Sequence, residues 1–90
     1  MKSLLTLLTE EDLVVREINA CESSVSFFQE RRDEVERITY NCSVKKADLE
    51  SCDRLIKEYQ NRAEQYSRQL LPIREQLYEY LKCLKQAETV

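Results

Sequence analysis

The feature that most constrains this chain is an unbroken run of apolar residues at intervals of seven. An apolar residue at every seventh position lies on one face of an α-helix and packs against a second helix. This run, here named the heptad stripe, predicts an all-α, elongated coiled-coil helix or helical hairpin that packs in a bundle with partner helices. Its eleven members are Val14, Cys21, Phe28, Val35, Cys42, Leu49, Ile56, Ala63, Leu70, Leu77 and Leu84.

The composition excludes most other folds. The 90 residues include no glycine and one proline. Because tight turns with positive φ favour glycine, folds with many such turns, and strands with them, are not expected. Charged residues of both signs make up 34% of the chain, which suits the solvated faces of long helices. The net charge of -3 argues against a dedicated nucleic-acid binder.

Companion apolar residues flank the heptad stripe, and they change sides along the chain. Early in the chain the companions precede their stripe partners by three residues, and from the middle onward they follow them by three. A uniform parallel homodimer keeps one pattern throughout, so the two halves are predicted to face different neighbours, either each other or helices of other subunits. The stripe and its companions form the predicted partner-helix interface; the companions are Ile18, Val25, Ile38, Cys52, Tyr59, Tyr66, Ile73 and Tyr80.

The tyrosines among these companions have two interpretations. Tyr59, Tyr66 and Tyr80 each combine a large ring with a hydroxyl that can stay solvated. Such residues suit the half-buried edge of a helical interface with a partner, and they equally suit the core within one chain. Both interpretations place the rings beside the stripe.

The helix is predicted to begin at Thr9, with Thr9 as the N-cap and acidic residues in the first turn. Residues 1–8 then form an apolar lead-in segment, and residues 9–88 form a single coiled-coil helical domain. The lead-in is either a docking peptide or a frayed end. Together with Phe27, which lies off the stripe, its leucines are candidate docking anchors: Leu4, Leu5, Leu7, Leu8 and Phe27.

Two places can interrupt the helix. The segment 39–44 begins with five weak helix formers, and Asn41 or Ser43 in it can cap a new helix. The heptad stripe crosses this segment without losing phase, so a continuous helix and a hairpin both remain open. At Pro72 a kink or a new last helix is expected, because proline lacks the amide hydrogen that the helix needs.

Acidic residues recur four positions before basic ones, in the orientation that stabilises a helix. Each such pair contributes only about 0.2–0.5 kcal/mol, and four of the six fall between residues 50 and 68, which makes that segment the most secure helix. The pairs are Asp12/Arg16, Asp33/Arg37, Glu50/Arg54, Asp53/Lys57, Glu58/Arg62 and Glu64/Arg68.

The sequence offers no site for chemistry. It has no histidine and no glycine-rich phosphate loop, so no catalytic residues, cofactor or metal site are predicted, and the chain is not expected to be an enzyme. The four cysteines are widely spaced and are expected to be free thiols that act as small apolar residues. Neither a signal peptide nor a membrane-spanning segment is apparent, so an intracellular, cytoplasmic protein without membrane insertion is expected.

In build, the chain resembles the tubulin-folding cofactor A family, whose members are small, acidic, glycine-poor helical proteins. The fragments that carry the resemblance are Leu8-Thr9-Glu10-Glu11, Val44-Lys45-Lys46 and Leu70-Leu71-Pro72. Their spacing differs from the family, in which the two lysines lie closer to the proline and the chain continues further after it. The resemblance implies a small helical chaperone that binds a globular client as a monomeric bundle.

Taken together, these features predict a non-catalytic helical subunit that mediates assembly of a heteromeric coiled-coil complex of cytoskeletal, kinetochore or trafficking type. Its partners would be other helical proteins and not nucleic acid. Two alternatives stay open: the small helical chaperone, and a homodimeric coiled coil that needs no other protein.

Overall fold

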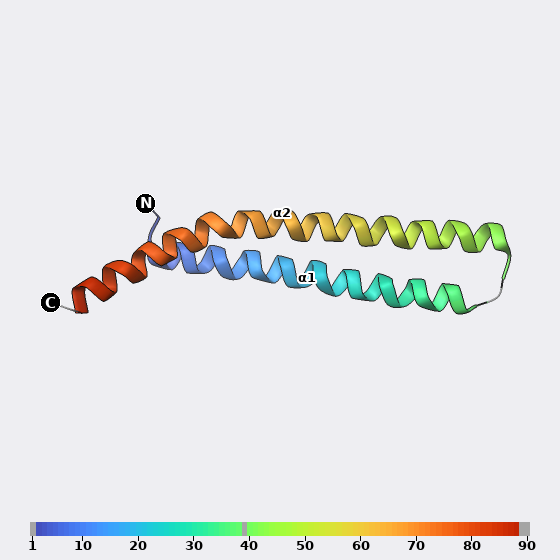
Figure 1. Ribbon diagram of the computed structural model, residues 1–90, viewed down its shortest axis with the longest axis horizontal. Helices are drawn as coiled ribbons and strands as arrows, with labels where there is room; N and C mark the ends of the chain where they lie inside the picture. Colours follow the sequence, from blue (N-terminus) through green and yellow to red (C-terminus); the bar gives the residue numbers. More distant parts are fainter. Residues whose placement is uncertain (1, 39, 89–90) are drawn as a thin grey trace.

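The chain turns back on itself in the middle and forms a long helical hairpin (Figure 1). The structure is a computed structural model that describes residues 2–38 and 40–88, with side chains up to residue 85. Helix α1 spans Leu4–Arg37 and helix α2 spans Cys42–Glu88, and the two run antiparallel, side by side. The described part of the chain contains no strand. The all-α prediction is therefore confirmed, and of the two open arrangements the hairpin is the one that forms.

The turn lies within the segment predicted to interrupt the helix. Ile38 ends α1 in an extended conformation, while Thr39 lies outside the described residues. Asn41 caps α2, because its side-chain Oδ1 accepts hydrogen bonds from the backbone amides of Ser43 and Val44, at 2.9 and 3.3 Å. One side chain thus satisfies two of the amides that a helix start leaves unpaired, and of the two candidate caps in the sequence, Asn41 and Ser43, Asn41 is the one used.

Removing this cap should destabilise the hairpin. Asn41→Ala is expected to lower the free energy of unfolding by about 1 kcal/mol, because two amides lose their acceptor. For a chain of this length the midpoint of thermal unfolding should fall by about 4–8 °C, measured by circular dichroism. Ser43→Ala is the control, since the Ser43 side chain is exposed and only its backbone amide contacts the cap. Equal losses in the two variants would contradict the capping role.

Tyr40 also holds the turn against α2. Its hydroxyl donates a hydrogen bond to Asp48 Oδ2 at 2.8 Å. Partial burial of the phenol, followed by the hydrogen bond and the negative charge of Asp48, raises the pKa of Tyr40 to about 12. The neutral phenol is the form that the folded chain favours.

This pKa shift makes the turn sensitive to alkali. The unfolded chain releases the Tyr40 proton near pH 10, whereas the folded chain holds it to about pH 12. Stability due to Tyr40 is therefore complete below pH 10 and is lost as pH rises toward 12. In urea titrations, the advantage of the wild type over Tyr40→Phe should shrink between pH 9 and 12. A difference between the two proteins that stays constant over this pH range would contradict the role of Tyr40.

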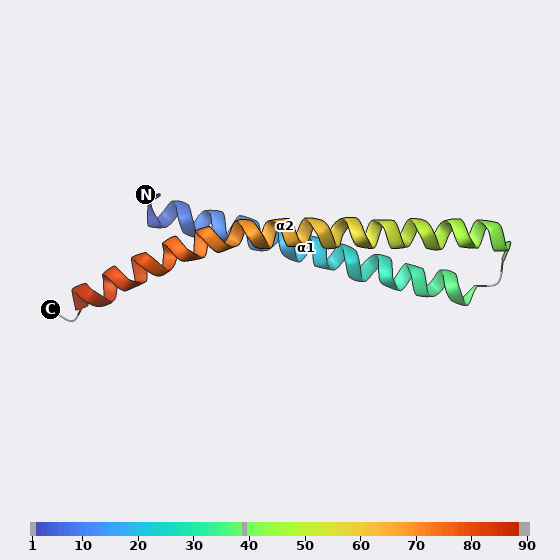
Figure 2. The ribbon, with the colours of Figure 1, turned by 45° about the horizontal axis from the view of Figure 1, so that its top comes forward.

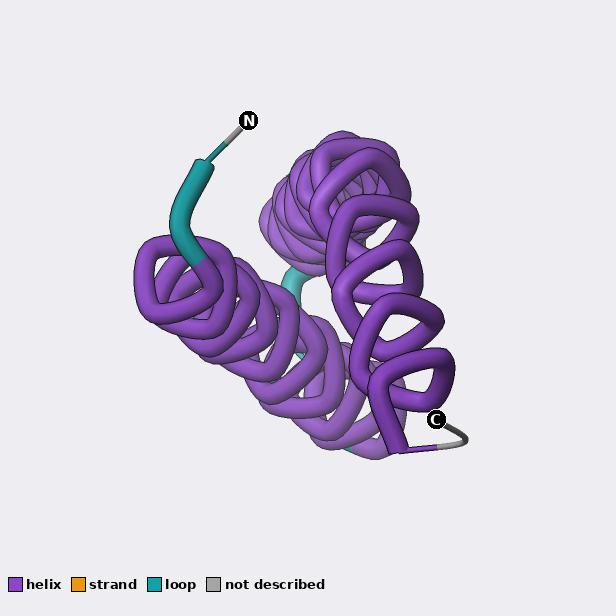
Figure 3. The backbone as a smooth tube through the Cα atoms, turned by 90° about the vertical axis from the view of Figure 1, so that its left-hand side faces the viewer, coloured by secondary structure: helices purple, strands orange, loops and turns teal. Residues whose placement is uncertain are grey.

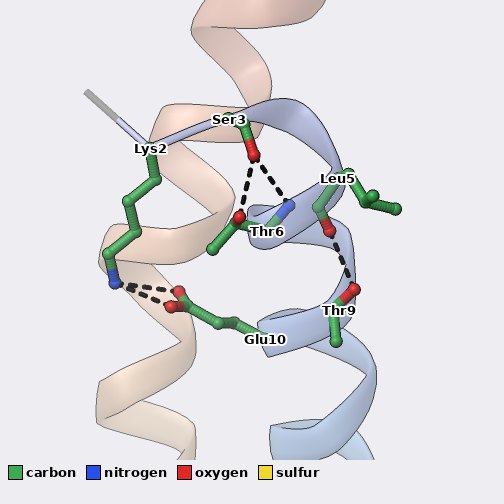
Figure 4. Close-up of polar contacts among 6 residues, drawn as sticks. All are labelled: Lys2, Ser3, Leu5, Thr6, Thr9 and Glu10. Atoms are coloured by element: carbon green, nitrogen blue, oxygen red, sulfur yellow. Dashed lines mark hydrogen bonds and ion pairs between the residues drawn. The ribbon is translucent and has the colours of Figure 1, made fainter.

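Helix α1 begins earlier than predicted. Its N-cap is Ser3, whose Oγ accepts from the Thr6 amide at 3.2 Å, and Thr9 instead donates its hydroxyl hydrogen to the Leu5 carbonyl at 2.8 Å (Figure 4). The predicted start at Thr9 is wrong, and most of the lead-in 1–8 is helical. Leucine favours helix, so extending the helix costs little, and the extension buries Leu7.

The two helices meet along one seam, in which few side chains are fully buried. At the open end of the hairpin, Tyr80 donates its hydroxyl hydrogen to the Lys2 carbonyl oxygen at 2.6 Å. Near the turn, Arg32 Nε lies 2.6 Å from Asp53 Oδ1. Only four of the described side chains are buried: Leu7, Cys21, Leu70 and Ile73.

Helix α2 passes through Pro72 without ending, and it bends there. Figure 2 shows its last third leaving the line of the first part, and Figure 3, viewed along the rod, shows the same change of direction. Because proline removes one backbone hydrogen bond and its ring crowds the preceding turn, a kink is the expected response. The kink that the sequence predicted is confirmed, and no separate last helix forms among the described residues.

The result is a thin rod. Its extents are 73 × 19 × 14 Å and its radius of gyration is 20.5 Å. A compact domain of this length has a radius of gyration of about 12 Å. The accessible surface is 7036 Å², against about 5,500 Å² for a compact monomer of this mass. The hairpin therefore leaves about 1,500 Å² more surface in contact with solvent than a globular chain does.

Candidate docking surfaces

The heptad stripe and its companions line the seam between α1 and α2. Sixteen of these nineteen residues are buried or half-buried, and the intrachain contact accounts for their cover. Three are exposed, and they lie at the two ends of the hairpin: Ile38 and Cys42 flank the turn, and Leu84 lies at the open end. Cys21, Leu70 and Ile73 are the buried members. The half-buried members are Val14, Ile18, Val25, Phe28, Val35, Leu49, Cys52, Ile56, Tyr59, Ala63, Tyr66, Leu77 and Tyr80.

An aromatic cluster interrupts the polar surface midway along the rod. Phe28 stacks on Tyr59 across the seam, with ring centroids 5.8 Å apart, and Phe27 meets Phe28 edge-on at 5.3 Å. The guanidinium of Arg31 lies 4.9 Å above Phe27, and that of Arg62 lies 5.2 Å from Tyr59. Phe27 remains 49% exposed. These five residues, the aromatic cluster, thus connect the seam to the outer surface.

The open end of the hairpin carries most of the remaining exposed apolar surface. Of the eleven large apolar side chains exposed in the described residues, eight lie in residues 4–13 or 71–84. Six apolar residues line a groove of about 470 Å³ there, together with Glu11, Arg74 and Tyr80. We name these six residues the open-end surface: Leu4, Leu8, Leu77, Tyr78, Leu81 and Leu84.

The predicted docking anchors divide into two groups. Leu4, Leu5 and Leu8 are exposed, as a docking role requires, and Phe27 is exposed within the aromatic cluster. Leu7 is different, because it has 0% of its surface exposed. It lies on the inner face of α1, seven residues before Val14, so it extends the heptad stripe and belongs to the core of the hairpin. As a docking anchor, Leu7 is a wrong prediction.

The sequence interpretation missed two members of the open-end surface, Tyr78 and Leu81. Leu81 stands four residues after Leu77 and three before Leu84, which places all three on one helical face. On α1, Leu4 and Leu8 show the same spacing of four. A search for a second apolar column beside the stripe would have found this surface.

Charged side chains surround the docking surfaces without forming a reactive site. Arg74 Nε lies 3.5 Å from Glu11 Oε2 at the edge of the groove. The hydrogen bond from Arg32 to Asp53, aided by the charges of Asp53 and Glu36, raises the pKa of Arg32 above its ordinary value. Both pairs are exposed to solvent, so each contributes little to stability. In the described part of the chain, no three metal-ligating side chains come together.

The thiols and the length of apolar sequence in the helices complete the description of the surface. Cys21, Cys42, Cys52 and Cys83 all carry free thiols. Neither of the described helices contains an apolar stretch long enough to cross a membrane.

No family model, no curated protein and no solved structure matches this chain. The aromatic cluster, the seam and the open-end surface are therefore the features from which a function can be inferred.

Proposed function

We propose that this protein is a non-catalytic helical subunit that assembles with helices of other proteins into a heteromeric coiled-coil complex. The observation that carries the proposal is the half-closed seam. Two helices cover each other along the heptad stripe, yet most stripe residues stay half-buried. A further helix laid along the seam would complete their burial, as additional helices do in three- and four-helix bundles.

The amount of exposed surface fits this role. The rod exposes about 1,500 Å² more than a compact chain of its mass. A standard interface buries about 800 Å² on each partner, so the excess corresponds to about two such interfaces.

The aromatic cluster supplies an anchor of the kind found at protein interfaces. Aromatic and arginine side chains contribute most of the binding energy at many interfaces. Phe27 projects from a ring pair that α1 and α2 already hold in place, so docking would cost little additional side-chain entropy.

The outer face of α2, which points away from α1, is a poor docking surface. An ion pair between residues four apart lies on it, with Arg68 to Glu64 at 2.6 Å. Burying these charges would require desolvation that their mutual attraction does not offset. The seam and the aromatic cluster are consequently the preferred docking faces.

Photo-crosslinking in cells tests the proposal. A benzophenone amino acid placed at Phe27 should give discrete products with a small set of helical proteins. The same group at Gln29, an exposed position on α1 beside the cluster, serves as the control and should give few products. Products of equal number and yield at both positions would contradict a docking role for the cluster.

The same experiment separates an assembly subunit from a chaperone. Stable subunit contacts persist when protein synthesis is stopped. Crosslinks to a folding client disappear under that treatment, and such a result would favour the small helical chaperone over the assembly subunit.

A further inference from the structure

Helix α2 extends past the start of α1. Tyr80 contacts the Lys2 carbonyl at the first residues of the hairpin, so the turns of α2 after Tyr80 run on past the first turn of α1. Figure 1 shows this extension at the red end of the ribbon. Leu81 and Leu84 lie on it, and both are exposed. We name residues 81–88 the overhang.

The apolar face of α2 widens after Pro72. Before the proline, one narrow stripe faces α1. After it, Leu77 and Tyr80 continue that stripe, while Tyr78 and Leu81 add a second apolar column beside it. The second column borders the groove whose other wall carries Leu4 and Leu8 of α1. The groove thus has the form of a vacant position for a third helix.

We infer that a second copy of this chain fills the groove. The two hairpins meet at their open ends, and their α2 helices run antiparallel around a two-fold axis near Leu81. The overhang of each copy then lies in the groove of the other, so Leu77 and Leu84 of opposite copies become neighbours. One contact covers both the overhang and the groove, as an isologous two-fold interface requires.

Charge favours this antiparallel arrangement. Glu75 and Glu79 precede Leu81 along α2, whereas Lys82 and Lys85 follow it. Antiparallel pairing around Leu81 brings the basic stretch of each copy beside the acidic stretch of the other. Parallel pairing would place like charges together, which is unfavourable.

The available area predicts a modest affinity. The open-end surface and the adjacent Leu71 expose on the order of 600 Å² per copy, which gives about 1,200 Å² for the pair and lies at the lower end of specific interfaces. Weak, transient contacts lie at this end of the size range, and we expect a dissociation constant on the order of 1–100 µM. The inference goes beyond the proposed function, because it uses the open end and leaves the aromatic cluster accessible to other proteins.

Solution mass and shape test the inference. For the reduced full chain, light scattering coupled to size exclusion should show a mass that rises from monomer to dimer as concentration increases. Small-angle scattering should then give a maximum dimension of about 125 Å, because two rods of 73 Å overlap over about 20 Å of helix. A monomer at every concentration up to about 500 µM, well above the expected constant, would overturn the inference. So would a dimer that stays near 73 Å, since that result indicates side-by-side pairing.

A matched pair of variants locates the contact. Leu81 is 57% exposed and Leu13 is 55% exposed, but only Leu81 lines the groove. Leu81→Asp should weaken dimerisation at least 10-fold, and Leu13→Asp should change it less than threefold. Circular dichroism should show equal helix content in both variants. Equal weakening in the two would contradict open-end pairing.

The outcome is separable from that of the proposed function. Crosslinking from Phe27 to other proteins should persist in Leu81→Asp, because the aromatic cluster lies midway along the rod. Loss of the dimer with intact crosslinks identifies the open end as the self-contact. Crosslinks without any wild-type dimer would overturn the inference and leave the proposed function standing.

Discussion

Ile56→Asp is expected to unfold most of the hairpin at 25 °C. Ile56 lies half-buried in the seam, where an aspartate would lose apolar contact and place an unpaired charge against α1. The combined loss is about 3 kcal/mol or more. A two-helix chain of this size has little stability to spare. Far-UV circular dichroism and urea titration should both report the loss of helix.

Gln60→Asp is the matched control for this change. It introduces the same residue on α2, at an exposed position one turn later. The low helix propensity of aspartate therefore affects both variants alike. Its effect should stay within about 0.5 kcal/mol. If the two substitutions destabilised the chain equally, the heptad stripe would not be what holds the hairpin together.

The second large effect is expected at Leu7. This side chain is completely buried, and Leu7→Ala should lower the free energy of unfolding by about 2–4 kcal/mol through lost contact and a residual cavity. The loss should appear as a lower midpoint in thermal and urea unfolding.

Leu5→Ala makes the same chemical change two residues away, at a position that is 76% exposed. It should leave the midpoint within about 0.5 kcal/mol of the wild type. Comparable losses at the two positions would show that the start of α1 does not pack on α2 in solution.

The seam was predictable because it follows from periodicity alone. A seven-residue spacing identifies the inner face of a helix whether its partner lies in the same chain or in another. The change of side by the companions has a simple explanation in the hairpin. Ile18 precedes Cys21 on α1, whereas Cys52 follows Leu49 on α2, so each helix keeps a register of its own. The turn between them removes any need for one continuous pattern.

The start of α1 was not predictable from local signals. Thr9 precedes acidic residues that suit a first helical turn, whereas Ser3 precedes leucines and a threonine, so the charges in the first turn favoured Thr9. Burial of Leu7 against α2 decides between them, and this is a tertiary contact that no short segment contains.

Long-range ion pairs escaped prediction for the same reason. The spacing of four suggested that Asp53 would pair with Lys57 on its own helix. In the structure Asp53 pairs with Arg32 across the seam instead. Local pairs such as Asp12 with Arg16 form as predicted, at 3.0 Å. Three of the six predicted pairs form, namely Asp12/Arg16, Glu58/Arg62 and Glu64/Arg68, so a spacing of four identifies part of the ion pairs along a helix and does not identify the pair across the seam.

The single seam also determines how the molecule comes apart. In a globular core each residue touches several elements, so losing one contact weakens many. Here each turn of α1 touches only the turn of α2 that faces it, and the contacts form a nearly one-dimensional series along the rod. Contacts close to Asn41 close a short loop, whereas the contact of Tyr80 closes almost the whole chain, at a greater entropic cost. This loop cost favours fraying from the open end toward the turn, whereas burial of Leu7, Leu70 and Ile73 stabilises the open half against it.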